Sequence, residues 1–247
     1  MAFTQSAFPV FLVILATAPA AQAQVPLQMS GEQPAALVRD AFASSYGQAL
    51  ADEFGEALSK AADPACLGTK KIAAASLRQR GLDLMVKRGT RMLEQSTSLI
   101  DSKAYDEKLA ATGGQSASRE LAQLSNDADV KRYRELERPI RLTAVLDTVF
   151  EQFDRYAESA KIKIAPVSPL ASGSDALLNS DPTEASEKAL KDFVATHPSP
   201  PLRRYLKLSE DAADATTAAV NLDQAGKTGP ATFFEGVEAD LAEICVR

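Results

Sequence analysis

PIRLTAVLDTVFEQFDRYA, residues 139–157, is the stretch that decides the fold of this chain. Its large apolar side chains recur at spacings of three and four residues: Leu142, Val145, Leu146, Val149, Phe150, Phe153 and Tyr156. That spacing places all of them on one face of an α-helix. Pro139 fits the first turn of such a helix, where its missing N–H has no intrahelical partner to lose. The stretch predicts an amphipathic helix whose apolar face belongs to the core.

Composition extends the helical prediction to the rest of the chain. Aromatic residues make up 6% of the sequence and Trp is absent. Ala, Leu, Glu, Lys, Gln and Arg are strong helix formers, and runs with the period-two pattern of strands are nearly missing beyond residue 23. We predict an all-α protein, an irregular bundle of about six to seven helices that follows a cleaved signal peptide.

Apolar periodicity and helix-start signals such as Ser199-Pro200 place the other helices. They are expected over 34–62, 69–100, 117–124, 127–138, 182–197, 199–225 and 230–247. Gly81 and Gly89 lie inside the second of these helices, where they either allow a neighbouring helix to approach or mark a break. We expect a continuous helix there, with or without a bend.

The order of these segments suggests two helical parts. Residues 24–33 are expected to form a flexible lead-in, and residues 34–160 an N-terminal helical part. Residues 161–181 are rich in Pro, Ser and Gly, which is typical of a linker or long loop. Residues 182–247 are then a C-terminal helical part that packs on the first.

The first 23 residues have the features of a secretory signal peptide. Residues 8–18 are almost entirely apolar, and Ala21-Gln22-Ala23 supplies the pattern that signal peptidase recognises, with cleavage before Gln24. The alternative is a retained membrane anchor, but the apolar run falls short of the roughly 20 residues that span a bilayer. We expect a bacterial protein that is exported, periplasmic or secreted, and that is soluble and not an integral membrane protein after cleavage.

Cys66 and Cys245 are the two cysteines of the chain. In an exported protein this count predicts a disulfide between them; the alternative is a pair of buried free thiols, which behave as small apolar groups. The bond would tie the start of the second helix to the last turn of the chain. Closing a loop of about 180 residues stabilises the folded state by at most about 5 kcal/mol.

Several catalytic and metal-binding chemistries lack the residues they need. The single histidine, His197, lies at a predicted helix end, where it can interact with the helix dipole. No Gly-x-Ser-x-Gly motif, calcium-binding loop or phosphate-binding loop is present. One histidine and two distant cysteines do not supply a zinc or copper site. We therefore predict no catalytic residues, no cofactor and no metal site.

Charge narrows the range of partners. The net charge of −6 argues against nucleic acid, whose binding requires cations that neutralise phosphates. Four cations are nevertheless spaced to share one side of the chain around Pro139: Lys131, Arg134, Arg138 and Arg141. They are candidates for binding an anionic partner such as a lipid head group. The alternative is a solvated face, in which Lys131–Glu135 and Glu137–Arg141 form pairs at the i,i+4 spacing.

A segment of the C-terminal part, about residues 183–225, contains ALKDFV (189–194) and SPPLRRYL (199–206). It resembles an uncharacterised family of exported bacterial all-helical proteins, which carry a Phe-Tyr-x-Ser-Pro-x-Gly-like motif between two helices. Here Val194 replaces the usual Tyr, extra residues separate Phe193 from Ser199-Pro200, and the Gly is missing. The resemblance implies an all-helical periplasmic protein and carries no assigned activity.

These observations lead to a hypothesis about function. We expect a binding or interaction protein of the bacterial cell envelope, not an enzyme, whose partners are other envelope proteins engaged by helix packing. One alternative is an envelope hydrolase that uses paired carboxylates. Another is a peripheral binder of lipid or membrane surfaces.

Overall fold

The computed structural model of the chain describes residues 33–112, 116–168, 172–221, 224–225 and 230–246. The predicted signal peptide (1–23) and all but the last residue of the lead-in (24–33) lie outside this range. Within it the chain forms helices and no strand, so the all-α prediction is confirmed. None of the helices in the described part is long and apolar enough to cross a membrane.

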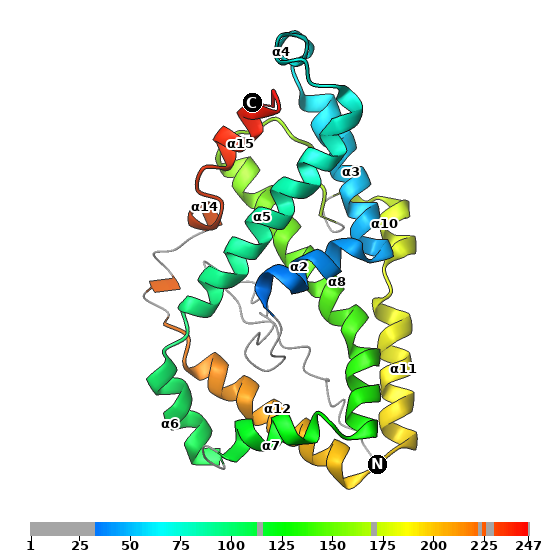
Figure 1. The fold of residues 1–247 in the computed structure, drawn as a ribbon, viewed down its shortest axis with the longest axis vertical. Coiled ribbons are helices and arrows are strands. Elements are labelled where there is room, and N and C mark those ends of the chain that lie inside the picture. The colour runs from blue at the N-terminus through cyan, green and yellow to red at the C-terminus, as the bar shows by residue number, and fades with distance from the viewer. Residues whose placement is uncertain (1–32, 113–115, 169–171, 222–223, 226–229, 247) are drawn as a thin grey trace.

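The larger core lies between four helices that form one half of an elongated molecule (Figure 1). They are α2 (Pro34–Ala43), α3 (Ser45–Ala61), α5 (Leu77–Ser98) and the upper part of α8 (Ala128–Ser159). Edge-to-face aromatic contacts link three of these helices, with Phe42 and Phe54 5.9 and 5.7 Å from Phe150 between ring centroids. Phe54 also lies 5.1 Å from Phe153. The apolar face predicted for residues 139–157 is therefore the centre of this core.

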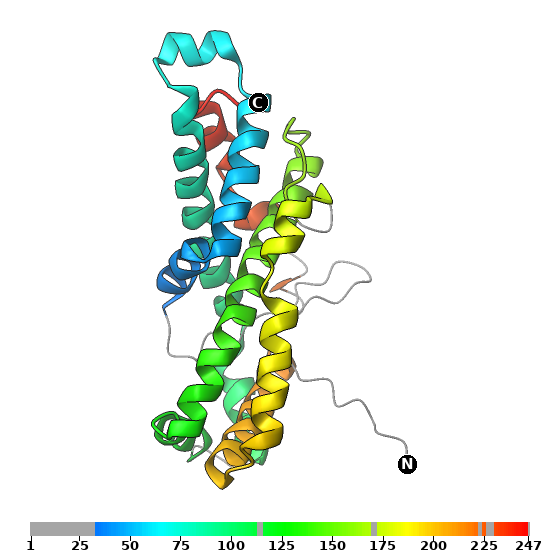
Figure 2. The same cartoon turned by 90° about the vertical axis from the view of Figure 1, so that its right-hand side faces the viewer.

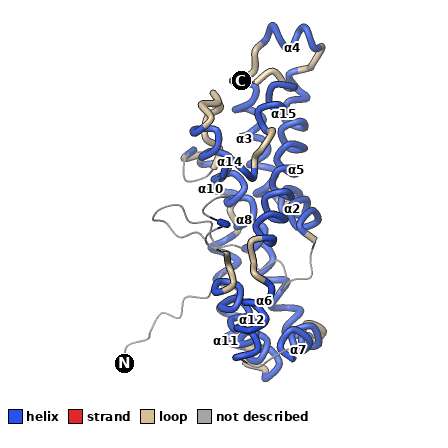
Figure 3. The backbone as a smooth tube through the Cα atoms, turned by 90° about the vertical axis from the view of Figure 1, so that its left-hand side faces the viewer, coloured by secondary structure: helices blue, strands red, loops and turns tan. Residues whose placement is uncertain are grey.

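The other half of the molecule is built around the lower part of α8. There α11 (Thr183–Thr196) runs beside α8, as Figure 2 shows, and α12 (Pro200–Ala218) packs against α6 (Ser102–Thr112), α7 (Ser116–Leu124) and α8. Figure 3 shows these helices at the lower end of the tube. Two smaller apolar clusters hold them together: Val130, Tyr133, Ile140, Leu190, Leu202 and Tyr205 in one, and Leu109, Ala117, Leu208, Ala212 and Ala215 in the other.

The helix expected over 34–62 is two helices, because the chain changes direction at Ser44. Ser44 is extended (φ −67°, ψ 160°), and its hydroxyl accepts a hydrogen bond from the Gly47 N–H at 3.0 Å, which caps α3. A Cβ at Gly47 would lie 2.2 Å from the Ala41 carbonyl oxygen. The cap and the close backbone approach together let α2 turn across α5 and α8.

The two helices expected over 127–138 and 139–157 are a single helix, α8, with Pro139 inside it. A proline within a helix removes one backbone hydrogen bond and costs about 3 kcal/mol. Apolar residues are buried on both sides of the proline. Tyr133 and Ile140 belong to the first of the two smaller clusters, and Leu142 belongs to the larger core. Packing at both ends thus keeps the helix continuous.

The expected helix over 69–100 begins only at Leu77, after the short helix α4 (Pro64–Lys70) and the 3-10 turn η1 (Ala74–Ser76). Lys71 has a positive φ of 54°, which ends α4. The prediction of continuity through Gly81 and Gly89 is confirmed, because both lie inside α5. A Cβ at Gly81 would come within 2.5 Å of Leu58, so the absence of a side chain allows α3 to pack closely.

Other differences concern regions that the sequence assigned to loops or to longer helices. Helix α6 was not expected. The segment predicted as a linker or long loop, 161–181, contains the helix α10 (Asp175–Ser180). The last expected helix is divided into α14 (Pro230–Phe233) and α15 (Val237–Glu243), because Gly236 between them has a φ of +81°. These breaks give more helices than the six to seven expected.

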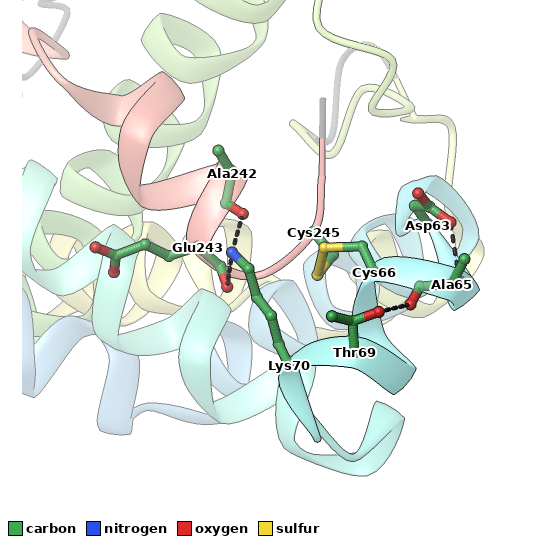
Figure 4. The surroundings of a disulfide bond; sticks show 8 residues. All are labelled: Asp63, Ala65, Cys66, Thr69, Lys70, Ala242, Glu243 and Cys245. Atoms are coloured by element: carbon green, nitrogen blue, oxygen red, sulfur yellow. Dashed lines mark hydrogen bonds between the residues drawn. A yellow bond between two sulfur atoms is a disulfide. The ribbon is translucent and has the colours of Figure 1, made fainter.

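Cys66 and Cys245 form the disulfide that their number predicted, with their Cα atoms 5.6 Å apart (Figure 4). We had expected Cys66 at the start of the second long helix, but it lies in the short helix α4. The Lys70 ammonium group donates to the Ala242 carbonyl at 2.8 Å, and the Asp63 N–H donates to the Cys245 carbonyl at 2.9 Å. Since α4 contains no buried residue, these links to the C-terminal segment hold it in place.

Removing the disulfide is expected to destabilise the protein. The Cys66→Ala/Cys245→Ala variant should unfold at a lower urea concentration, with a loss of at most about 5 kcal/mol, because the unfolded chain regains the freedom that the loop closure removes. A reductant should lower the midpoint of the wild type and leave that of the variant unchanged. An identical midpoint for reduced and oxidised wild type would contradict the expectation.

Arg88 of α5 forms a second connection to the C-terminal segment. Its side chain is 5% exposed, and it forms an ion pair with Asp240 of α15. It also donates to the Glu235 carbonyl oxygen at 2.6 Å. Burial alone raises the pKa of Asp240, but hydrogen bonds from Arg88 and Lys87 outweigh burial and hold that pKa below its usual value. The buried guanidinium thus orients the turn between α14 and α15.

Arg88 and Arg91 provide a matched pair of substitutions on one helix. Arg91 also reaches Glu235, but its side chain is 38% exposed and that of Glu235 is 74% exposed. Arg88→Met should cost about 1–3 kcal/mol, because the Glu235 carbonyl and Asp240 lose their buried donor while Asp240 keeps its ion pair with Lys87, whereas Arg91→Met should cost about 1 kcal/mol or less. Chemical denaturation of both variants checks this order. Equal losses would show that burial of the Arg88 pair has no importance.

Candidate interaction surface

The four cations predicted to share one side of the chain lie on α8 and mostly have partners within the chain. Arg138 forms an ion pair with Asp40 of α2. Arg134 and Arg141 face Glu137, whose pKa is raised by burial and is lowered in turn by these two guanidinium groups. Lys131 is exposed. Three of the four cations therefore interact with carboxylates of the same chain.

Of the two pairs expected under the alternative of a solvated face, the structure shows one. Glu137 interacts with Arg141 as expected, and it also accepts a hydrogen bond from Tyr133. Glu135, however, pairs with Arg132 at 2.9 Å, where the sequence had favoured Lys131 as the partner. Both Arg132 and Lys131 lie one helical turn from Glu135, and spacing alone does not choose between them.

His197 lies directly after the last residue of α11. Its ring stacks on Phe193 with the centroids 4.6 Å apart, and its Nδ1 atom lies 3.3 Å from the Phe193 carbonyl oxygen. Among the residues that the structure describes, no group of three or more His, Cys, Asp or Glu side chains is arranged to hold a metal ion.

Carboxylates gather where α3, α8 and α10 meet, a grouping that the sequence did not predict. Tyr46 of α3 donates a hydrogen bond to Asp147 of α8. Burial raises the pKa of Asp147 to about 6, the Tyr46 hydrogen bond opposes the rise, and the carboxylates of Asp181 and Glu151 add to it. Burial and the Asp147 carboxylate also raise the pKa of Tyr46 above its usual value. Asp147 thus lies near two groups of its own charge, Asp181 and Glu151.

Helix α10 is fastened to this region at both of its ends. Ser174, the residue before the helix, donates from its hydroxyl to Glu53 of α3 at 2.7 Å. Leu177 is fully buried in the larger core. Asp181, the residue after the helix, accepts from the Thr183 N–H at 2.8 Å and lies near Asp147. The position of α10 is therefore set by one apolar side chain and by polar contacts on either side.

Leu178, next to the buried Leu177, points to solvent and is 60% exposed. It is the only large apolar side chain exposed to this degree among the described residues. Figure 1 shows α10 beside α3, on the side of the molecule that Figure 2 turns to the viewer. We define the α10 surface as Leu178 together with Asp175 and Asp181, the two exposed carboxylates that lie three residues before and after it.

One sequence signal for the α10 surface lies within the segment 161–181. Its last part, SDALLNSD, has adjacent leucines that follow a Ser-Asp start signal for a helix. Residues next to each other on a helix lie about 100° apart, so a short helix that buries one leucine leaves the other exposed. The high content of Pro, Ser and Gly in residues before it concealed this signal.

The chain matches no family model, no curated protein and no solved structure. The resemblance of residues 183–225 to an exported helical family accordingly stays a prediction. The chain's own residues are the basis for inferring its function.

Asp147 is expected to make stability depend on pH. Its pKa is 3.8 when unfolded and about 6 when folded, so its favourable contribution is complete below pH 3.8 and is lost as the pH rises through 6. Asp147→Asn keeps an acceptor for Tyr46 without the charge and should therefore stabilise the protein at pH 7.5, by up to about 3 kcal/mol. The gain should shrink at pH 4.5.

Denaturation of wild type and variant at the two pH values tests this expectation. Asp214→Asn, on the exposed side of α12, is the control and should change stability by less than about 0.5 kcal/mol. A stabilisation by Asp147→Asn that is equal at both pH values would show that its charge is not the cause.

Proposed function

We propose that this chain is an exported binding protein of the bacterial cell envelope that recognises another envelope protein through the α10 surface. The observation that carries the proposal is the exposure of Leu178 on a helix that is otherwise firmly attached. Every other large apolar side chain that the structure describes is buried or partly buried. An exposed apolar side chain on a firmly attached helix supplies area that a protein partner can bury, because the centre of an interface is more apolar than the rest of a protein surface.

The proposed location rests on two independent features. Residues 1–23 have the pattern of a signal peptide. The Cys66–Cys245 bond is of the kind that persists in oxidising compartments such as the periplasm and is rare in the bacterial cytosol. Both features support export.

The charged groups favour the binding of a protein over the binding of a lipid surface. A lipid-surface binder needs free cations, whereas Arg138 pairs with Asp40, and Arg134 and Arg141 face Glu137. The α10 surface itself is acidic and would be repelled by anionic lipids. These contacts leave little support for membrane binding through α8.

A carboxylate-dependent hydrolase is the second candidate, because one observation favours it. Asp147 has a pKa of about 6 and lies near Glu151 and Asp181, and a protonated acid close to an ionised carboxylate is what glycoside hydrolysis requires. The test is release of soluble fragments from purified cell-wall peptidoglycan. Activity that Asp147→Asn abolishes and Asp214→Asn preserves would favour the hydrolase over the binding protein.

Site-specific photocrosslinking in intact cells tests the binding proposal. A benzoylphenylalanine in place of Leu178 should give a discrete crosslinked product on irradiation, because the partner lies against this position. The same group in place of Gln123, which is exposed on α7, is the control and should give little or none. Absence of a product at position 178, or the same product at both positions, would contradict the proposal.

A further inference from the structure

Residues 63–76, which we call the α4 segment, form an end of the molecule without a single buried residue. The segment contains α4 and η1, and Figures 1 and 2 show α4 at the upper tip, beyond the ends of α3 and α5. Leu67 and Ile72 are the side chains of this segment that pack against the larger core, and both are partly exposed. A helix of seven residues is not stable by itself. The order of the α4 segment therefore depends on its links to the C-terminal segment.

Hydrogen bonds and one covalent bond form these links (Figure 4). The Asp63 N–H donates to the Cys245 carbonyl at 2.9 Å, but this bond lies at the first residue of the segment. The Lys70 ammonium group donates to the Ala242 carbonyl at 2.8 Å. Lys70 is exposed, so water competes for its hydrogen bond and the net stabilisation is small. The Cys66–Cys245 bond is therefore the link that fixes the helix.

The C-terminal side of the disulfide is anchored by contacts that do not involve sulfur. Val237, Leu241 and Val246 are buried in the larger core. The buried Arg88 also holds Asp240 of α15 in an ion pair. These contacts remain when the disulfide is broken. The two sides of the bond are thus held unequally, and the α4 segment is the side that depends on it.

We infer that the Cys66–Cys245 bond is a redox-controlled clasp, which a dithiol opens in the folded protein to release the α4 segment while the C-terminal segment and the cores stay in place. The inference is independent of the proposed function, because α4 and α10 lie apart on the molecule (Figure 1). The released segment uncovers Leu67 and Ile72, so the surface at this end of the molecule depends on the redox state of its surroundings.

The exposure of the two cysteines indicates how the reaction proceeds. Cys66 is partly exposed, whereas Cys245 is 2% exposed. Because access governs the rate of thiol–disulfide exchange, a thiolate of the dithiol attacks the Sγ atom of Cys66, and Cys245 leaves as a thiolate that takes up a proton.

The second thiolate of the dithiol completes the reaction. It attacks the dithiol's own sulfur in the mixed disulfide, and Cys66 leaves as a thiolate that is protonated in turn. The dithiol gives up two electrons and two protons and becomes a disulfide. The protein gains both and carries two thiols.

Hydrogen–deuterium exchange without denaturant, with the disulfide intact or treated with dithiothreitol, tests the inference. Dithiothreitol should reduce the bond, and exchange in the α4 segment should then become about tenfold faster or more. Amides of α5 and α8 should stay protected more than about a hundredfold relative to an unfolded chain. Oxidised glutathione, added after dithiothreitol is removed, should restore slow exchange in the α4 segment.

Two variants separate the disulfide from the other links. Cys66→Ser/Cys245→Ser should show fast exchange in the α4 segment with and without dithiothreitol. Lys70→Met keeps the disulfide and removes the exposed hydrogen bond at the same end. Its oxidised form should exchange within about threefold of the wild type, and it should respond to dithiothreitol as the wild type does.

Four results would overturn the inference. The bond resists dithiothreitol until urea unfolds the protein; reduction leaves exchange in the α4 segment unchanged; reduction removes the protection of α5 and α8 together with that of the α4 segment; or Lys70→Met speeds exchange as much as reduction does. The third result identifies global unfolding, which the reduced wild type reveals even if the double variant does not fold.

Discussion

The apolar face of α8 is the constraint on which the rest of the structure depends. Phe150 and Phe153 lie on it, and edge-to-face contacts join them to α2, α3 and the residue after α14, Phe234. The same helix continues through Pro139 into the small cluster that contains Val130 and Leu190, where Tyr133 contacts Tyr205 of α12. Because one helix contributes to both of these clusters, α8 joins the two halves of the molecule. Packing on either side of Pro139 outweighs the loss of one backbone hydrogen bond there.

The C-terminal segment is held by packing together with covalent and ionic links. Its short helices, α14 and α15, and the residues next to them bury six apolar side chains in the larger core: Phe233, Phe234, Val237, Leu241, Ile244 and Val246. The Cys66–Cys245 bond joins this segment to α4, while the buried Arg88 holds the turn before α15 through Asp240 and the Glu235 carbonyl. A helix of seven residues is too short to be stable by itself, so these links and the burial of Val237 and Leu241 in the larger core set its position.

Carboxylates organise the middle of the molecule, close to the helix that carries the exposed Asp175. Glu53 and Asp154 accept hydrogen bonds from the chain around α10, and Asp147 accepts one from Tyr46. Each of these bonds satisfies an acceptor without neutralising its charge. The bonds to Glu53 and Asp154 hold the chain around α10 in place, and our proposal for function depends on that attachment.

Residue type and spacing by themselves determined the helical class, the core face of residues 139–157, the cysteine pairing and the continuity of α5 through its glycines, because these follow from local periodicity and from the number of cysteines. Only the tertiary structure decided that the chain turns at Ser44 and that α8 continues through Pro139. It also decided that Arg134 and Arg141 face Glu137, and that a helix within the expected linker exposes Leu178.

These outcomes depend on tertiary packing. Local propensity does not encode which distant side chains will compensate a proline, pair with a cation or cover one of two adjacent leucines.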